Sequence, residues 1–439
     1  MKKKLFKNIL IFLLIYILCF LYSFFISTVY NDEIWNYGFS YNIASGLIPY
    51  RDFNMVVTPL YSLIGSLFIK VIGGYLFSFH LFNSIILASI IYISYKKLRC
   101  KSFILIPFIF LNCYPGYNIL SVLIILVIIN LIDKEIKYKD YIIGLLVGIM
   151  FLTKQHIGIC LVVPLIYYSK DKLKGIIGML SPITLFLVYL IWNNALYEFI
   201  DYCFLGLLEF GDSNNILLFL PIEIIICLVI LYKLFNSNFK KQKLFYLLMY
   251  QIVTVPIFDD YHFMIGFIPV LYYILLVKDI EKYKIKYYII ISLVFFCAWN
   301  FKVHQFNDLN FYSDNNSYLY GRNIPSYVNL EDISLYIDNN RDKYSHIYIL
   351  SKNAYYVKLN AKYTLDKFDL INKGNMGYNG SNTYIEEIGE YCQKNSCMFI
   401  LYKYEFSGGE SQTDKHILEF VKNNYEFKEE VHLFNIYSN

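Results

Sequence analysis

Charged side chains are scarce in this 439-residue chain, where they make up 17% of the residues against 57% for hydrophobic ones. A soluble domain of this length carries roughly a quarter charged residues. The mean hydropathy is +0.45, and several nearly uncharged windows reach the ~18 residues that a membrane-crossing helix needs. The composition excludes a soluble protein and predicts an α-helical polytopic membrane protein.

Several motifs are also missing. The chain has no evident internal repeat, which counts against a transporter built from inverted repeats. It has no glycine-rich loop of the kind that binds nucleotide phosphates, and its basic residues lie in short loops rather than in a patch, so no nucleic-acid partner is expected. Seven of the nine cysteines are scattered through apolar sequence without ligand spacing. Cys392 and Cys397 lie in the polar tail and could pair if that tail is outside the cytosol.

The basic residues predict the orientation in the membrane. Six clusters hold 22 of the 26 lysines and arginines in residues 1–302, and positive charge in short loops marks the cytosolic side. Between successive clusters lie apolar stretches long enough for an out-and-back pair of helices, each with a polar break midway. We therefore expect all clusters in the cytosol and all breaks outside. The clusters lie at 2–7, 96–101, 134–139, 170–174, 233–243 and 278–286.

Residues 59–77 look like a further span, but counting them would place the cluster at 96–101 outside and reverse every later loop. We interpret them as an amphipathic helix at the outer interface, interrupted by Gly73 and Gly74. About eleven spans remain. The first stays as an anchor, which places the N-terminus in the cytosol and the C-terminus outside the plasma (cytoplasmic) membrane. The predicted spans are roughly 8–28, 79–95, 102–114, 117–132, 141–152, 157–169, 175–193, 215–232, 244–257, 263–277 and 285–301.

The character of the chain changes near residue 303. Residues 303–439 carry a net charge of −5, whereas residues 1–302 carry +10. We predict a transmembrane domain at 1–302, with the first outer loop and its interfacial helices at 29–78, and a small soluble extracytoplasmic α/β domain at 303–439. The linker 307–327 is expected to pack on the bundle. The α/β domain should contain helices near 330–340, 383–394 and 414–424 and strands near 346–350, 397–402 and 432–437.

Every prominent polar cluster falls on the predicted outer side. Carboxylates at the mouth of a membrane bundle are costly to keep there, so they are functional candidates. A carboxylate can accept a proton from an acceptor hydroxyl. Cations can bind the phosphate of a donor and stabilise that phosphate as the leaving group. This set suits sugar transfer from a lipid-linked phosphate. The clusters are Asp32/Glu33, Arg51/Asp52, Lys154 to His156, Glu198/Asp201, Glu209/Asp212, Asp259 to His262, and Arg322.

Short motifs in these clusters resemble a known family. Asp32-Glu33 directly after the first span, the run 46–53 (GLIPYRDF) and the run 58–61 (TPLY) look like the first outer loop of GT-C glycosyltransferases. The resemblance is closest to the protein O-mannosyltransferase and aminoarabinose transferase branch. The runs 153–155 (TKQ) and 260–263 (DYHF), each at an outer turn, are similar to positions in that branch. The family usually has two prolines where this chain has Thr58-Pro59.

The resemblance implies a GT-C-like bundle, a polyprenyl-phosphate-sugar donor rather than a nucleotide sugar, inversion at the anomeric carbon, and a glycan, lipid or protein acceptor in or near the lipid bilayer. Asp32 matches the family's catalytic carboxylate and would be general base, with Glu33 assisting or replacing it. Asp52 would shape the acceptor side of the loop. Lys154, His156 and His262 would contact the donor phosphate, with Arg51 and Arg322 as further contacts. Some family members hold a divalent metal, for which Asp32, Asp260 and His262 could be ligands, although no metal-site spacing is present.

Plainer interpretations remain open at this stage. Helix capping is an alternative role for Asp32, Glu33, Asp260 and His262. Asp52 could pair with Arg51. Lys154 could extend to the interface, and His156 could be a turn residue that is hydrogen-bonded within the fold.

Three other functions also remain. The chain could be a transporter or flippase of a lipid-linked or small substrate, a receptor-like protein whose soluble domain binds a partner, or a lipid-linked glycan ligase or polymerase. The last would need a larger outer loop late in the bundle.

Overall fold

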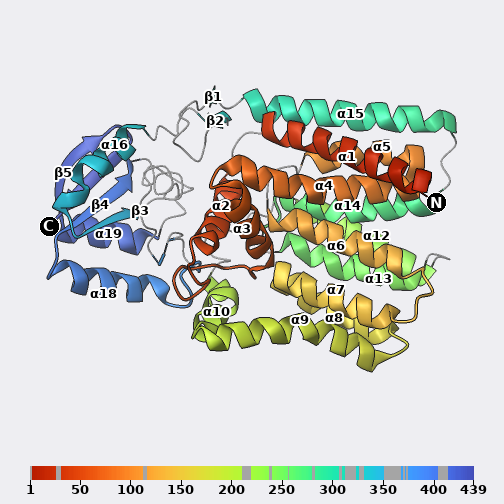
Figure 1. The fold of residues 1–439 in the computed structure, drawn as a ribbon, viewed down its shortest axis with the longest axis horizontal. Helices are drawn as coiled ribbons and strands as arrows, with labels where there is room; N and C mark the ends of the chain where they lie inside the picture. The colour runs from red at the N-terminus through yellow and green to blue at the C-terminus, as the bar shows by residue number, and fades with distance from the viewer. Residues whose placement is uncertain are drawn as a thin grey trace.

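A helical bundle and a small α/β domain lie end to end in the computed structural model (Figure 1). The two chain termini lie at opposite ends of this arrangement (Figure 1). The structure describes residues 2–25, 31–111, 116–209, 219–236, 240–255, 257–278, 282–305, 309–311, 323–325, 331–350, 367–368, 371, 374–403 and 414–439.

Each of the eleven predicted spans overlaps a described helix. Among the described residues, four stretches are long and apolar enough to cross a membrane by length and composition, namely Lys3–Phe24, Leu76–Phe110, Lys172–Trp192 and Asp260–Val277. Others are much shorter, so the number of spans stays a prediction. The helices are α1 (Lys2–Phe25), α4 (Leu76–Leu98), α5 (Ser102–Phe110), α6 (Tyr117–Leu131), α7 (Lys139–Thr153), α8 (Gln155–Tyr168), α9 (Lys172–Trp192), α12 (Leu220–Asn236), α13 (Lys241–Tyr250), α14 (Asp260–Val277) and α15 (Lys282–Gln305).

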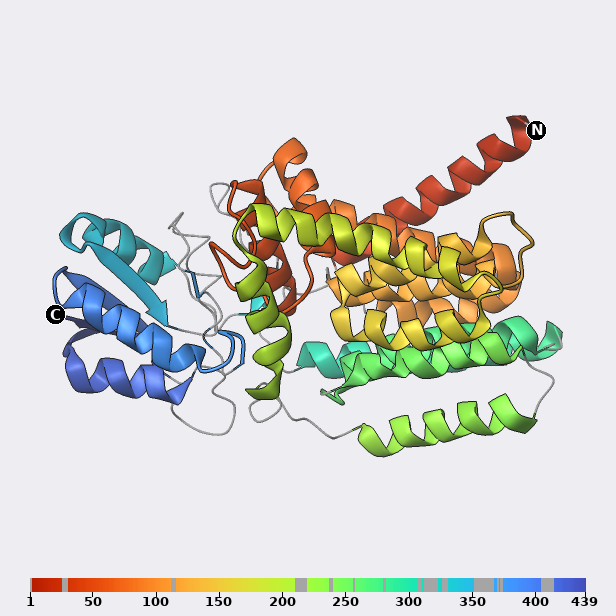
Figure 2. The same ribbon diagram turned by 90° about the horizontal axis from the view of Figure 1, so that it is seen from below.

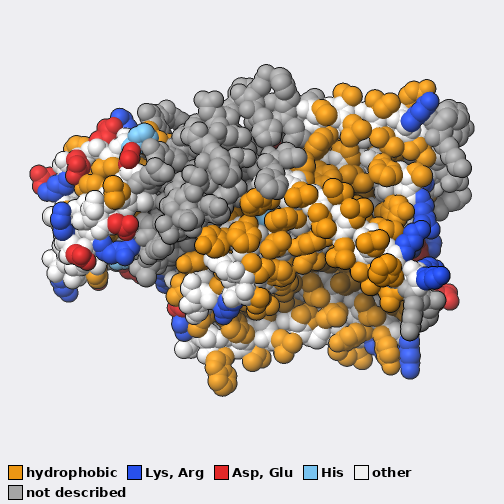
Figure 3. Space-filling model, turned by 45° about the horizontal axis from the view of Figure 1, so that its top comes forward, with side chains coloured by type: hydrophobic (Ala, Val, Ile, Leu, Met, Phe, Trp, Pro, Cys, Tyr) orange, Lys and Arg blue, Asp and Glu red, His pale blue; other side chains and the backbone are white. Residues whose placement is uncertain are grey.

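The basic clusters gather at one end of the bundle. Lys101 donates a hydrogen bond from Nζ to the carbonyl of Lys278 at 2.9 Å, and Lys240 pairs with Asp133 at 2.6 Å, so loops far apart in sequence meet there. Figure 3 shows Lys and Arg side chains along this end and a broad hydrophobic surface beside them. A hydrophobic surface of this extent is the surface that lipid covers in an integral membrane protein.

Helices α7 and α9 pack backbone to backbone. A Cβ on Gly144 would lie 2.0 Å from the carbonyl oxygen of Gly175, and one on Gly178 would lie 2.2 Å from that of Tyr141. Side chains larger than hydrogen are therefore excluded at both crossings. Small residues at such spacing let membrane helices approach closely, where lipid offers no hydrophobic force to drive them together.

Short elements cover the other end of the bundle. Helices α2 (Asn31–Ala44) and α3 (Leu60–Ile72) lie between the bundle and the α/β domain (Figure 1). Helix α3 ends at Gly73, whose φ of +126° suits only glycine, so the predicted helix and its glycine interruption are confirmed. Helix α10 (Leu196–Ile200) and the π-helical turn η2 (Asp201–Leu205) run across the direction of the bundle helices (Figure 2).

The C-terminal domain is a mixed sheet with helices. Strands β3 (His346–Leu350), β4 (Cys397–Tyr402), β5 (Glu426–Val431) and β6 (Phe434–Ser438) have the order β3-β4-β6-β5, with β3 parallel to β4 and the other pairs antiparallel. Helices α16 (Glu331–Asn340), α18 (Gly380–Cys392) and α19 (Lys415–Asn424) occur where the sequence predicts them. Strand β5 was not predicted. Two short strands, β1 (Leu309–Phe311) and β2 (Asn323–Pro325), pair within the predicted linker.

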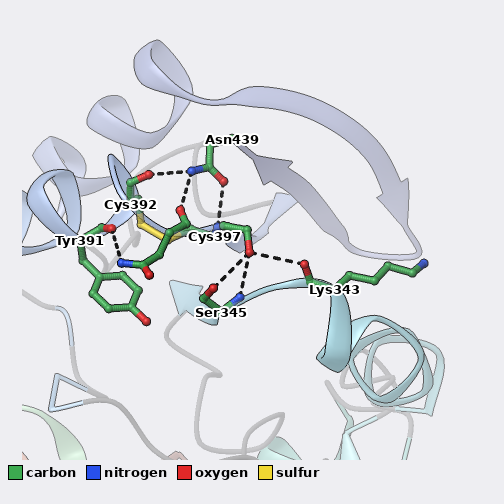
Figure 4. Close-up of a disulfide and its surroundings, with 8 residues drawn as sticks. Lys343, Ser345, Tyr391, Cys392, Cys397 and Asn439 are labelled. Carbon is green, nitrogen blue, oxygen red and sulfur yellow. Dashed lines mark hydrogen bonds between the residues drawn. A yellow bond between two sulfur atoms is a disulfide. The ribbon is translucent and has the colours of Figure 1, made fainter.

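The two tail cysteines form a disulfide. Cys392 at the end of α18 joins Cys397 at the start of β4, with Cα atoms 5.7 Å apart (Figure 4). The Asn439 side chain donates to the Cys392 carbonyl at 2.7 Å and accepts from the Cys397 amide at 2.8 Å (Figure 4). A disulfide persists in an oxidising compartment, as expected for a domain outside the cytosol.

Candidate active site at the end of the bundle

A cavity of about 320 Å³ opens at the bundle end that faces the C-terminal domain. Its wall combines α2, the first outer loop, the start of α6, the turn between α7 and α8, the turn η3 (Gln251–Thr254) and the start of α14. Segments from separate predicted outer breaks therefore converge on one site. The lining is mostly apolar with a few polar groups, as in small-molecule sites. The lining residues are Asp32, Trp35, Val56, Val57, Tyr117, Lys154, Gln155, His156, Leu207, Ile252, Val255, Ile257 and His262.

Among the residues that the structure describes, Asp32 is the one carboxylate that lines the cavity. It lies in the first turn of α2, and its backbone carbonyl accepts a hydrogen bond from the side chain of Asn36 at 2.7 Å. The carboxylate is open to the cavity, but protein surrounds that cavity. Desolvation therefore raises the pKa of Asp32, and it outweighs the opposing charges of His262 and Lys154. A carboxylate with a raised pKa is a better proton acceptor than a free one.

Lys154 is the buried cation of the site. It lies in the turn between α7 and α8, and its Nζ donates to Asn118 Oδ1 at 2.9 Å and to the Val253 carbonyl at 3.3 Å. The ammonium also lies 5.6 Å from the centre of the Tyr117 ring. Burial lowers the pKa of Lys154 to about 7, against the opposing charges of Asp259 and Asp32. The ammonium is thus held in place by neutral acceptors, and a bound anion would stabilise its charged form.

Gln155 fastens two outer loops together. Its Nε2 donates to the carbonyl of Val56 at 2.9 Å and to the carbonyl of Cys203 at 3.0 Å. The Thr58 hydroxyl donates to the carbonyl of Phe151 at 2.7 Å, which ties the first outer loop to the end of α7. These bonds fix Val56 and Val57 as part of the cavity wall.

The start of α14 presents His262 to the cavity. Asp259 is the N-cap of this helix, because its Oδ1 accepts from the His262 amide at 2.8 Å. The same oxygen lies 2.8 Å from Nδ1 of the His262 ring. Among the residues singled out from sequence, Asp260 was expected to cap the helix or bind metal. The structure gives the capping contact to Asp259 instead, and Asp260 is not among the residues that line the cavity.

Glu33 points away from the cavity, although it neighbours Asp32. Its Oε1 lies 2.5 Å from Nε2 of His80 on α4, and Nδ1 of His80 lies 2.6 Å from the hydroxyl of Ser23 on α1. All three side chains are fully buried. This network joins α2 to α4 and α1, so the arrangement suits Glu33 to a positioning role.

Of the other predicted site residues that the structure describes, Arg51 and Asp52 lie away from the cavity and His156 lines it. Arg51 and Asp52 form an exposed ion pair at 2.7 Å and do not line the cavity. The carboxylate of Asp52 also accepts from the Ile48 amide at 2.7 Å, which closes a turn of the first outer loop. His156 does line the cavity. Arg322 lies outside the described residues.

The metal ligands suggested by the resemblance do not assemble. Within the part of the chain that the structure describes, no group of three or more His, Cys, Asp and Glu residues is placed to hold a metal ion. His262 directs Nδ1 at Asp259, and Asp260 lies apart from the cavity lining. The residues that are described do not fit a metal centre, and no catalytic step is derived through one.

The C-terminal domain contacts the first outer loop beside the cavity. The Asn54 amide donates to the carbonyl of Lys367 at 2.7 Å, and the Asn54 side chain donates to the carbonyl of Asn375 at 2.8 Å. Close by, the amide of Tyr378 donates to Asp201 Oδ1 at 2.9 Å. Contacts from Lys367, Asn375 and Tyr378 therefore bridge the first outer loop and η2, the two segments that Gln155 also joins.

Two glycines allow this contact to be close. A Cβ on Gly377 would lie 1.9 Å from Asp201 Oδ2, and the φ of Gly377 is +87°. A Cβ on Gly206 would lie 2.4 Å from the carbonyl oxygen of Gly374. The domain contact thus depends on backbone meeting backbone at this point.

No protein-family model and no curated protein sequence matches this chain. Solved structures do. The crystal structure of ArnT from Cupriavidus metallidurans bound to undecaprenyl phosphate aligns over 98% of this chain and 97% of its own, with a TM-score of 0.57 and 9% identity. The apo state of the same protein aligns over the same shares with a TM-score of 0.58 and 10% identity. The chain has the fold of ArnT.

The shared fold confirms the predicted architecture of a helical membrane bundle followed by a small α/β domain. The alignment spans bundle and C-terminal domain alike, so the small sheet belongs to the shared architecture. At 9–10% identity the likeness describes the fold and assigns no residue. The site therefore rests on the contacts within this chain. The sequence alone does not reveal the anchoring roles of Asn118, Gln155 and Asp259, because each depends on a partner that the spacing of residues does not show.

Proposed function

We propose that this protein is an integral membrane glycosyltransferase that moves a sugar from a polyprenyl-phosphate carrier to an acceptor hydroxyl on the non-cytosolic face. The observation that carries the proposal is the pairing of a carboxylate and a buried lysine, Asp32 and Lys154, on the wall of one cavity at the end of an ArnT-like bundle. The ArnT structure with the same fold binds undecaprenyl phosphate. A shared fold does not by itself assign the same ligand to this chain, so the assignment of a polyprenyl-phosphate ligand depends on the chemistry of the cavity.

The proposed reaction assigns a separate task to each group. Asp32 accepts the proton of the acceptor hydroxyl while the hydroxyl oxygen attacks the anomeric carbon. The bond from that carbon to the phosphate oxygen breaks, and its electron pair leaves with the polyprenyl phosphate. Attack opposite the leaving group inverts the anomeric configuration. The Lys154 ammonium binds the phosphate and stabilises the charge that grows on it as it leaves.

Further contacts support this assignment. Asn118 and the Val253 carbonyl hold the Lys154 ammonium at the cavity wall without neutralising its charge, so the charge is available to an anion. Asp259 orients the ring of His262 through Nδ1, which leaves Nε2 as the ring nitrogen that a phosphate oxygen or an acceptor hydroxyl can reach. We assign His262 and His156 as second contacts to the donor phosphate.

The location on the non-cytosolic face is also part of the proposal. The basic loops meet at the opposite end of the bundle from the cavity, which supports a cytosolic position for that end. The disulfide in the C-terminal domain supports an oxidising compartment at the cavity end. A lipid-linked sugar can reach such a site without a soluble nucleotide donor.

The test uses purified full-length protein, a panel of radiolabelled polyprenyl-phosphate sugars, and a membrane extract that supplies glycan, lipid and protein acceptors. We expect one donor to bind and to be consumed. Asp32→Asn should retain donor binding and lose turnover by more than ~10²-fold. Asp338→Asn, which alters an exposed carboxylate on α16, is the matched control. If no polyprenyl-phosphate sugar binds the wild-type protein, the proposed function is wrong.

A further inference from the structure

Two residues of the cavity wall each carry a buried polar atom that has no role in the reaction described above. Trp35 and Gln155 both line the cavity. The indole Nε1 of Trp35 and the amide Oε1 of Gln155 are buried without a hydrogen-bond partner among the described residues. Buried polar atoms are nearly always paired in folded proteins, because an unpaired one loses its bonds to water and gains none. Two of them at one cavity point to a ligand.

The chemical identity of each atom is fixed. The indole nitrogen of tryptophan can only donate a hydrogen bond. In Gln155 the amide nitrogen must face the carbonyls of Val56 and Cys203, because a carbonyl can only accept. The amide oxygen Oε1 is therefore the atom without a hydrogen-bond partner in the part of the chain that the structure describes, and it can only accept a hydrogen bond. The Gln155 side chain is 3% exposed, so its orientation is set by the protein rather than by solvent.

The pair discriminates between ligand classes. A carboxylate accepts but cannot donate to Oε1, and an ammonium donates but cannot accept from Nε1. A hydroxyl does both. We propose that Trp35 and Gln155 form a neutral subsite that binds the donor sugar, and that the sugar position held there carries a hydroxyl rather than an amino or a carboxylate group. This inference rests on the proposed function and adds the chemistry of one position of the sugar.

The position of the pair is consistent with this role. Trp35 lies three residues after Asp32 on α2, so both side chains lie on one face of the helix. Gln155 directly follows Lys154, the proposed phosphate contact. A sugar joined to a phosphate at Lys154 would lie between the general base and the neutral subsite.

The experiment compares two lipids in detergent with full-length protein. One is bare undecaprenyl phosphate, and the other is the same lipid bearing a single neutral hexose on the phosphate. Affinities are measured for wild type, for Trp35→Phe, which keeps an aromatic ring and removes the N–H, and for Trp192→Phe as the matched control. Trp192 is 85% exposed at the end of α9 and does not line the cavity.

We expect Trp35→Phe to weaken binding of the hexose lipid by about tenfold and to leave binding of the bare lipid unchanged. Trp192→Phe should match wild type with both lipids. The thermal stability of Trp35→Phe should be equal to or above that of wild type, because the substitution removes an unpaired buried donor. As a measurement independent of any variant, wild type should lose affinity when the hexose hydroxyls are acetylated.

The outcomes separate the two claims. If wild type binds neither lipid, the proposed function fails and the inference fails with it. If wild type binds both lipids but Trp35→Phe weakens them equally, or neither, the hydroxyl subsite is wrong while the proposed function stands. Unchanged affinity for the acetylated lipid likewise overturns the subsite.

Discussion

The pH dependence of donor binding follows from the burial of Lys154. Burial lowers the pKa of Lys154 to about 7 in the free protein, so the ammonium loses its proton as the pH rises through neutrality. A phosphodiester donor keeps its single negative charge over this range and binds the charged lysine. The affinity for the donor should therefore be constant below about pH 7 and should fall above it by up to about tenfold for each pH unit, until the whole contribution of the charged lysine is lost.

The free energy that the contact between Lys154 and the donor phosphate contributes to binding follows from its chemistry. A charge-assisted hydrogen bond is worth about 1.5–3 kcal/mol, so Lys154→Met should weaken donor binding by roughly 10-fold to 150-fold at about pH 6. The variant should also lose the pH dependence. Lys174→Met, which removes an exposed lysine from the basic end of the bundle, is the control and should behave as wild type.

The stability of the lipid-free protein should show the opposite slope. Lys154 has a folded-state pKa of about 7 against a usual value of 10.5. Between these values the unfolded chain binds a proton that the folded protein does not, so the free energy of unfolding should rise with pH by about 1.4 kcal/mol per unit from this group. Below about pH 7 both states hold the proton and the contribution is constant.

The assay is donor binding by calorimetry or fluorescence in detergent from about pH 6 to about pH 9, with thermal unfolding of the lipid-free protein measured alongside. Flat donor affinity in wild type across this range would refute the reasoning. So would a pH dependence that persists in Lys154→Met, since the titrating group would then be a different one.

Three further predictions concern the surroundings of the cavity. Gly377→Ala places a Cβ against the Asp201 carboxylate at a positive φ, so it should weaken the domain contact by about 1–3 kcal/mol, seen as faster limited proteolysis and reduced turnover. Gly389→Ala, whose Cβ meets a ring at 3.6 Å, should change neither, and equal behaviour of the two variants contradicts the contact. Glu33→Gln should lower the melting temperature yet keep turnover within about tenfold of wild type; a loss beyond ~10²-fold would make Glu33 a base. A cysteine at exposed Ser45 should react with an impermeant thiol reagent in intact cells while exposed Cys100 does not, and the reverse pattern would invert the topology.

The bundle could be predicted from sequence because its signals are local. Hydrophobic length marks each helix, and lysine clusters mark one end, whatever the helices later contact. Strand β5 gave no such signal. Its residues Glu426–Val431 are mostly charged, and five of the six are exposed. It is an edge strand that forms by pairing with β6 rather than by burying a face of its own.

The site was predictable only in part, for a geometric reason. Asp32 and Lys154 stand out because they are charged residues at outer turns. Glu33 was grouped with Asp32 because it is the next residue, but successive residues of a helix face different directions, and Glu33 faces His80. The partners of Gln155 lie at Val56 and Cys203, far from it in sequence. Contacts of this kind arise from the fold and leave no periodic pattern.

The glycine contact between α7 and α9 has a consequence for how a long lipid reaches the cavity. Two helices whose backbones touch leave no seam through which an isoprenoid tail could slip sideways, and neither helix can slide without a clash at Gly144 or Gly178. The α7–α9 side is thus a closed wall toward the bilayer. Helix α7 ends one residue before Lys154, so this wall also fixes the height of the ammonium in the membrane. The carrier lipid of the proposed donor would therefore reach Lys154 from another flank of the bundle.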